Sequence, residues 1–81
     1  MDIENKIHQY ILENMLFSDD PSSLKRDMSL VEDGVIDSTG VLEIAEYIEE
    51  SFSIKVDDED MVPENFDSVE KIAAYIQRKL G

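Results

Sequence analysis

The sequence contains no cysteine, and this absence excludes disulfide bonds and thiolate metal sites. Any thiol chemistry in which the chain takes part therefore needs a thiol that comes from outside the protein. There is also a single histidine, His8, which excludes most metal clusters built on histidine. His8 lies beside Ile7 in an amphipathic segment, so we expect a solvated helix residue and not a catalyst.

Long apolar runs are missing as well. No apolar stretch exceeds a few residues, which argues against a membrane span. No charged-then-apolar signal segment opens the chain, so we expect a cytoplasmic protein. The length of 81 residues predicts one small domain over residues 1–81, without room for a deep cleft walled on every side.

Basic residues are scarce. The chain has seven of them against 20 acidic residues, which gives a net charge of −13. This sign disfavours nucleic acid and anionic membranes as partners, whereas basic protein partners would be attracted faster. Acidity that only keeps a small protein soluble is the alternative interpretation of the same composition.

Hydrophobic periodicity predicts a first helix over residues 2–16, which Asp2 can cap and residues 18–23 can end. Its apolar residues recur at spacings of three and four: Ile3, Ile7, Tyr10, Ile11 and Met15. A long connection over about 18–37 follows, with a turn at Gly34. The apolar residues expected to pin it onto the helices are Leu24, Met28, Leu30, Val31 and Ile36.

A second helix is predicted over residues 38–52. Its apolar face is expected to consist of Val41, Ala45, Ile48 and Phe52, with Ile44 flanking them. The residues expected on its other side are Thr39, Glu43, Glu46, Tyr47 and Glu50. A brief third helix should lie between Glu59 and Phe66, where Pro63 either starts or interrupts it.

The last helix should begin at a cap formed by Asp67 or Ser68, since Asp67 and Glu70 have the spacing of a capping box. Its apolar face is predicted to contain Val69, Ile72, Ala73, Ile76 and Leu80. The fold class is therefore all-α: a small four-helix bundle of three main helices and one short helix, with a long first loop.

The chemically suggestive residue is Ser38, because it places a hydroxyl at a helix N-terminus directly after the long loop. A phosphate attached there would meet unpaired backbone N–H groups and the positive end of the helix dipole. Serine and aspartate are also common helix N-caps, and local chemistry alone favours a cap over a modification site.

The stretch 30–43, in which Asp37-Ser38 is followed five residues later by Glu43, resembles the attachment motif of acyl carrier proteins. The pair Glu43-Ile44 is similar to the Glu-hydrophobic pair of that family, and residues 47–52 to its acidic helix end. The resemblance continues through the acidic turn and the closing amphipathic helix, so it covers nearly the whole chain. Length, charge and the order of helices agree with it.

The resemblance implies that Ser38 receives 4′-phosphopantetheine from coenzyme A through a phosphopantetheinyl transferase, and that Asp37 supports the site. The arm ends in a thiol, which suits a chain without cysteine. Cargo would ride there as a thioester, loaded by an acyl or aminoacyl ligase and passed to separate synthases or transferases. The carrier itself would catalyse nothing, since Ser38 has no histidine near it in sequence.

Acidic residues concentrate in the segment 37–60, which holds nine acids and one base, Lys55. In the family, the acidic second helix docks on basic patches of partner enzymes, whereas a solvated face without a partner is the alternative. The candidates for recognition are Thr39, Leu42, Glu43, Glu46 and Glu50, with Asp57 as a further one. The acidic run 57–60 lacks the glycine and alternating ligands of a calcium loop, so we expect no metal site.

Two residues depart from the common pattern of the family. Thr39 stands where leucine usually follows the serine, and leucine there offers partners an apolar contact. Gly40 should loosen the helix start by about 0.5–1 kcal/mol relative to alanine. Together they favour a carrier for a specialised pathway over bulk fatty acid synthesis.

The nature of the cargo stays open between two branches. A fatty or polyketide acyl chain would be partly shielded between the second and third helices by apolar residues: Val41, Ala45, Ile48, Met61 and Val62. An aminoacyl cargo would need no such shelter. No linker flanks residues 1–81, so we expect a discrete, monomeric carrier. The alternative from another class is an unmodified acidic interaction or inhibitor protein in which Ser38 is only a helix cap.

Overall fold

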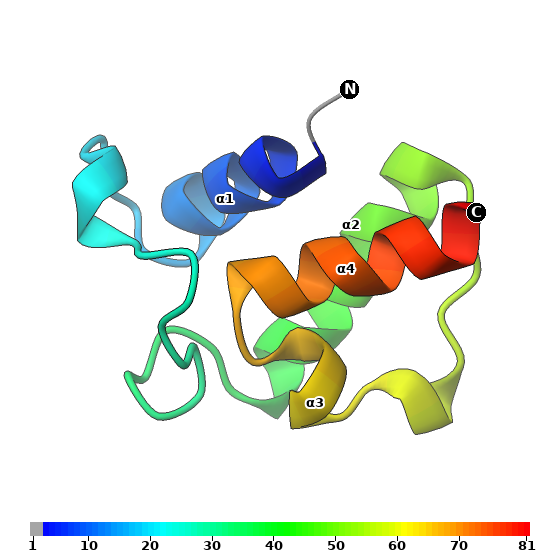
Figure 1. The fold of residues 1–81 in the computed structure, drawn as a ribbon. Coiled ribbons are helices and arrows are strands. Elements are labelled where there is room, and N and C mark those ends of the chain that lie inside the picture. Colours follow the sequence, from blue (N-terminus) through cyan, green and yellow to red (C-terminus); the bar gives the residue numbers. More distant parts are fainter. Residues whose placement is uncertain (1–2) are drawn as a thin grey trace.

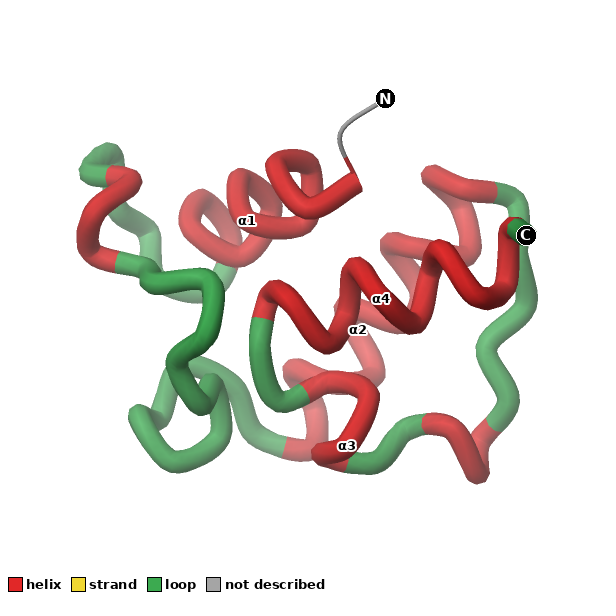
Figure 2. The backbone as a smooth tube through the Cα atoms, viewed as in Figure 1, coloured by secondary structure: helices red, strands yellow, loops and turns green. Residues whose placement is uncertain are grey.

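The computed structural model describes residues 3–81, and every regular element among them is helical, as predicted. The elements are α1 (Ile3–Asn14), the 3-10 turn η1 (Pro21–Ser23), α2 (Ser38–Phe52), the 3-10 turn η2 (Asp58–Asp60), α3 (Pro63–Phe66) and α4 (Val69–Leu80). The short helix α3 and the long loop between α1 and α2 can be followed in Figures 1 and 2. The predicted cap Asp2 lies outside the described residues.

Of the predicted stripe on α1, Ile3, Ile7 and Ile11 are buried in the core, whereas Tyr10 and Met15 are only partly buried against it. The prediction for His8 is wrong. Its side chain is buried, and Nε2 lies 2.7 Å from the carbonyl oxygen of Leu24. A carbonyl can only accept, so Nε2 carries the proton, and His8 ties α1 to the start of the long loop.

The helix also ends earlier than predicted, at Asn14 instead of residue 16. The N–H of Ser18 donates to the carbonyl of Leu12 at 3.0 Å, which closes the C-terminal turn around Phe17. Phe17 adopts a positive φ of 53°, a left-handed conformation that stops the helix.

The long loop is held by buried apolar residues, as predicted for Leu24, Leu30 and Ile36. Val31 does not pin the loop, because 47% of its surface is exposed. Gly34 makes the expected turn with a positive φ of 74°.

Helix α2 runs from Ser38 to Phe52, as predicted. Its most enclosed residues are Ile44, Ala45 and Ile48, whereas Val41 is only partly buried. The apolar face is therefore rotated slightly toward Ile44 relative to the prediction, and Val41 is left near the surface.

Pro63 starts α3 and does not interrupt it. Ser68 caps α4 by accepting a hydrogen bond from the N–H of Lys71 at 3.1 Å. The predicted capping box of Asp67 with Glu70 is wrong, because the Asp67 carboxylate bonds instead to the long loop. Leu80, predicted on the apolar face of α4, is 47% exposed, since the helix end projects beyond the core.

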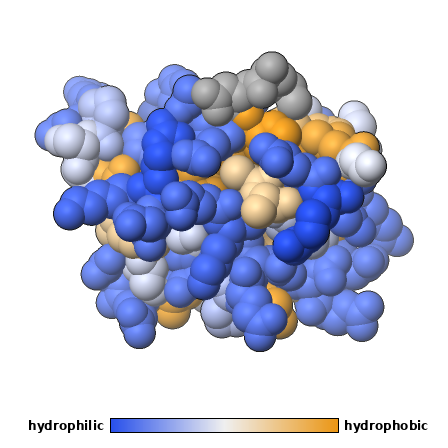
Figure 3. Space-filling model, in the orientation of Figure 1, coloured by the Kyte–Doolittle hydropathy of each residue, from blue (hydrophilic) through white to orange (hydrophobic). Residues whose placement is uncertain are grey.

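Helix α4 is the centre of the bundle and packs against α1, α2 and α3 (Figure 1). The face of the molecule in Figure 3 is largely hydrophilic, with a few apolar patches between the polar side chains. No helix among the described residues is long and apolar enough to cross a membrane.

Candidate functional site

Ser38 is the first residue of α2, and its side chain is exposed. The cap of this helix is Asp37, whose Oδ1 accepts a hydrogen bond from the N–H of Gly40 at 2.9 Å. The Ser38 hydroxyl makes no hydrogen bond to any residue in the range 3–81. The structure thus corrects the alternative in which Ser38 serves as the helix cap.

Gly40 fixes how the loop enters α2. It is buried, and a Cβ atom at this position would lie 2.9 Å from Cβ of Ile36. Ile36 is itself buried and held by its N–H, which donates to the carbonyl of Leu30 at 3.2 Å. Gly40 thus has a packing role in addition to its expected cost in helix propensity, because a larger residue would push the loop away from the helix start.

Asp67 ties the long loop to the junction of α3 and α4. Its carboxylate accepts from Ser29 Oγ at 2.8 Å and from the N–H of Val31 at 3.2 Å. Its carbonyl accepts from the N–H of Leu30 at 2.7 Å. This clamp places the loop opposite α3, beside the start of α2, and sequence spacing alone misassigned Asp67 to a local cap.

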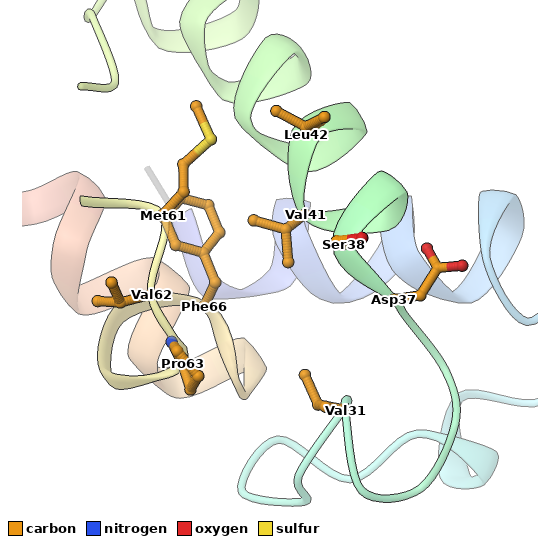
Figure 4. Close-up of a pocket in the computed structure, with 9 residues that line it drawn as sticks. All are labelled: Val31, Asp37, Ser38, Val41, Leu42, Met61, Val62, Pro63 and Phe66. Carbon is orange, nitrogen blue, oxygen red and sulfur yellow. The ribbon is translucent and has the colours of Figure 1, made fainter. Parts of the chain in front are cut away.

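An apolar cavity of about 420 Å³ opens next to Ser38, between α2, α3 and the long loop (Figure 4). Its walls are formed by Val31, Asp37, Ser38, Val41, Leu42, Met61, Val62, Pro63 and Phe66. Three of the five predicted cavity residues are among them. The other two, Ala45 and Ile48, face the core instead and do not line the cavity.

The sequence analysis missed four apolar residues of this cavity: Val31, Leu42, Pro63 and Phe66. Val31 was assigned to the core and Leu42 to partner recognition, and Phe66 marked only the end of a helix. What these four residues share is their position around Ser38. That position follows from the bonds by which Asp67 holds the long loop against α3, and the sequence does not show those bonds.

Three of the wall residues also form an apolar rim at the surface. Val31 is 47% exposed, Leu42 53% and Val62 36%, so they cover the opening without closing it. Figure 4 shows Met61 and the Phe66 ring on one side of the cavity and Val41 and Leu42 on the other, with Ser38 beside Val41. An apolar group tethered at Ser38 could enter between these two sides.

A second hollow of about 770 Å³ also includes Ser38 in its lining. It is bounded by the end of the long loop and the first turns of α2, including Thr39, Gly40 and Glu43. Ser38 therefore lines both the apolar cavity and this second hollow.

The predicted recognition residues are all exposed on α2: Thr39, Leu42, Glu43, Glu46 and Glu50. Beside them, the rings of Tyr47 and Tyr10 stack with centroids 3.9 Å apart. Burial raises the pKa of Tyr10, and the charges of Glu43, Tyr47 and Glu46 add to the rise. The further candidate, Asp57, lies on another segment, with Oδ2 3.9 Å from Nζ of Lys79.

The surroundings of Ser38 do not form an acid–base centre. His8 lies in α1, where it is buried and bonded to the carbonyl of Leu24, so it cannot activate the Ser38 hydroxyl. Among the described residues, no group of histidine, cysteine and acidic side chains could hold a metal ion. In the first turn of α2 the N–H of Gly40 is bonded to Asp37. The N–H groups of Ser38 and Thr39 have no partner among residues 3–81, and with the positive end of the helix dipole they suit a phosphate on Ser38.

The chain is similar to proteins whose names state a carrier role. It is 30% identical over 79 residues to the acyl carrier protein of Bdellovibrio bacteriovorus, covering 98% of this chain and 96% of that protein. It is 41% identical over 59 residues to an acyl carrier protein of Rhodococcus erythropolis, covering 73% of this chain and 63% of that protein. No family model matches the chain.

Proposed function

The chain belongs to the acyl carrier protein family, whose members are carriers and not enzymes, and we propose that Ser38 is its attachment point for 4′-phosphopantetheine. Members of this family generally carry that group and interact with synthases and transferases. The observation that carries the proposal is the exposed Ser38 hydroxyl, which has no hydrogen bond within residues 3–81 and stands at a helix start beside an apolar cavity.

The residues around Ser38 fit this group in two respects. The first-turn N–H groups of α2 can receive the phosphate, and Asp37 keeps this turn formed through its bond to Gly40. The cavity edge at Ser38 gives the far end of a flexible arm an apolar place to rest. When bound, the group supplies the thiol that this chain lacks and carries cargo on it as a thioester.

Attachment requires a transferase and coenzyme A. The Ser38 oxygen would form a phosphodiester with the phosphopantetheine part, its proton would leave, and adenosine 3′,5′-bisphosphate would be released. Ser38 has no base of its own nearby, so the partner transferase must supply proton removal. Its recognition of the carrier is expected to involve the exposed acidic residues of α2 and basic residues of the partner.

The test is intact mass after incubation with coenzyme A, magnesium and a promiscuous phosphopantetheinyl transferase. The parent chain should gain one phosphopantetheine and Ser38→Ala none, whereas Ser51→Ala, an exposed serine at the other end of α2, should gain it like the parent. No gain on the parent would contradict the proposal and leave an acidic interaction protein as the better interpretation.

The apolar walls of the cavity favour an acyl cargo over an aminoacyl one. Val41, Met61 and Val62 would contact a hydrocarbon chain, whose burial is worth about 0.8 kcal/mol per methylene. Melting temperatures of the loaded chain should therefore rise with acyl length until the cavity is filled. A flat series would support a polar cargo that stays in solvent.

Thr39 supports a specialised pathway. It is exposed where leucine would offer an apolar contact, and Leu42, one turn later, is the apolar residue that this face presents. Thr39→Leu should therefore improve acceptance by enzymes of bulk fatty acid synthesis. Equal acceptance of the parent and Thr39→Leu by such an enzyme would count against a specialised role.

A further inference from the structure

Asp60 directly precedes the three residues that form one wall of the cavity: Met61, Val62 and Pro63. Its carbonyl accepts from the N–H of Val62 and from Nδ2 of Asn65, both at 2.9 Å. Its carboxylate accepts from the hydroxyl of Tyr75 at 2.9 Å. The same residue thus connects η2, the cavity wall and α4.

Tyr75 is linked to the cavity wall by two contacts, one through its ring and one through its hydroxyl. Its ring packs against Phe66, which lines the cavity, with centroids 5.5 Å apart. Its hydroxyl reaches past that contact to the Asp60 carboxylate. The residue is buried, so the bond is formed where water competes little for the donor.

The segment that carries the wall is acidic and only partly buried. Four consecutive carboxylates, residues 57–60, repel one another, and the three residues of η2 bury no side chain. Within residues 3–81, the other polar contact of this segment with α4 is that of Asp57 with Lys79 at 3.9 Å, and the following α3 is bonded to α4 through Arg78 and Asn65 at 2.9 Å. A half-exposed ion pair contributes little.

We propose that the Tyr75–Asp60 hydrogen bond is a latch that holds the 61–63 wall against α2, so that its opening and closing control how well cargo on Ser38 is sheltered. The sheltering of cargo rests on the proposed function; the latch itself is a property of the unloaded chain. Opening the latch would swing Met61 and Val62 away from Val41 while leaving the helices packed.

The first test is hydrogen exchange of backbone amides in the unloaded chain. Tyr75→Phe keeps the ring against Phe66 and removes only the donor, so amide exchange at Met61 and Val62 should rise about ten- to a hundredfold, the effect of losing one bond to a charged acceptor. Exchange at Ile44 and Ile72, in the centres of α2 and α4, should stay unchanged.

Two substitutions at the acceptor separate the bond from the charge. Asp60→Ala should reproduce the local rise, whereas Asp60→Asn keeps an oxygen acceptor for the Tyr75 hydroxyl and should exchange within about twofold of the parent. Unchanged exchange at Met61 and Val62 in both Tyr75→Phe and Asp60→Ala would overturn the latch. A uniform rise over all helices would overturn it too, since it would assign both residues to overall stability.

The second test uses the loaded chain. An octanoyl thioester should be cleaved faster by hydroxylamine in Tyr75→Phe and Asp60→Ala than in the parent and Asp60→Asn. An acetyl thioester, too short to occupy the cavity, should react equally in all four. Equal octanoyl rates despite faster local exchange would overturn control of the cargo. A chain that cannot be loaded at Ser38 would contradict the proposed function, and the exchange test would still decide the latch.

Discussion

Gly40 in the first turn of α2 packs directly against Ile36 at the end of the long loop, where a Cβ atom on Gly40 would lie 2.9 Å from Cβ of Ile36. Both residues are buried, and the atom in the way belongs to the rigid base of a branched side chain. The close approach sets the direction in which the loop delivers Ser38 to the helix.

Gly40→Ala should therefore lower the free energy of unfolding by up to about 2 kcal/mol. Overpacking costs about 1–3 kcal/mol, and the better helix propensity of alanine returns only about 1 kcal/mol. Urea unfolding followed by circular dichroism measures the difference. Thr39→Ala is the matched control, because that neighbour is exposed and should be neutral or slightly stabilising. A stabilised Gly40→Ala protein would show that the loop yields easily.

Asp37→Ala should destabilise the protein by about 1 kcal/mol, since it removes the side-chain acceptor for the N–H of Gly40. Asp37→Asn keeps an oxygen acceptor at the same place and should lie within a few tenths of a kcal/mol of the parent. Thermal unfolding of the three proteins checks this order. Equal losses in both variants would attribute the effect to the charge and not to the cap.

Stability should fall in the alkaline range because of Tyr75. Burial, with the Asp60 carboxylate as the next cause, raises the pKa of Tyr75 to about 12 from its ordinary 10.0. The folded state thus favours the neutral phenol of Tyr75. The stability that this group contributes to the fold is complete below pH 10 and is lost as the pH rises toward 12. Between these values the free energy of unfolding should decline by at most about 1.4 kcal/mol per pH unit on this account.

Tyr75→Phe is the control for this pH dependence, since it lacks the ionising group and retains the ring. Its stability should decline less steeply above pH 10 than that of the parent. Parallel declines would mean that other groups cause the alkaline loss.

Salt should stabilise the fold, because the net charge of −13 makes the chain repel itself. Raising the ionic strength from about 0.01 M to about 0.1 M shortens the screening length from about 30 Å to about 10 Å, and the denaturation midpoint should rise. The described residues contain no cluster for a metal ion, so magnesium and sodium chloride at matched ionic strength should act similarly. An unchanged midpoint in both salts would contradict this account.

Periodicity predicted the helices well, because their apolar residues repeat along single segments of chain. The bounds of α2 followed from such local signals. They left open whether Pro63 starts or interrupts α3, and the structure shows that it starts it. Contacts between segments could not be predicted this way. The sequence predicts His8 as a solvated residue, because it does not show that the loop places the carbonyl of Leu24 against its ring. It predicts Asp67 as a helix cap, because it does not show the contact of Asp67 with Ser29.

The candidate site at Asp37 and Ser38 was named from the resemblance of the surrounding stretch, because a serine before a helix by itself favours a cap. The distinction between cap and free hydroxyl needed the bond of Asp37 to the N–H of Gly40. The cavity combines the loop, α2 and α3, so Val31 and Phe66 could not be assigned to it from spacing along the chain.

The central claim is that the arm is attached at Ser38, and the most direct measurement is its localisation by tandem mass spectrometry after transfer from coenzyme A. Cleavage after Arg26 and Lys55 releases the peptide 27–55, in which the hydroxyls that compete with Ser38 are those of Ser29, Thr39, Tyr47, Ser51 and Ser53. The account predicts one phosphopantetheine, with fragment ions that place it on Ser38. An unmodified peptide, or a group placed on Thr39 or any other hydroxyl, would contradict it.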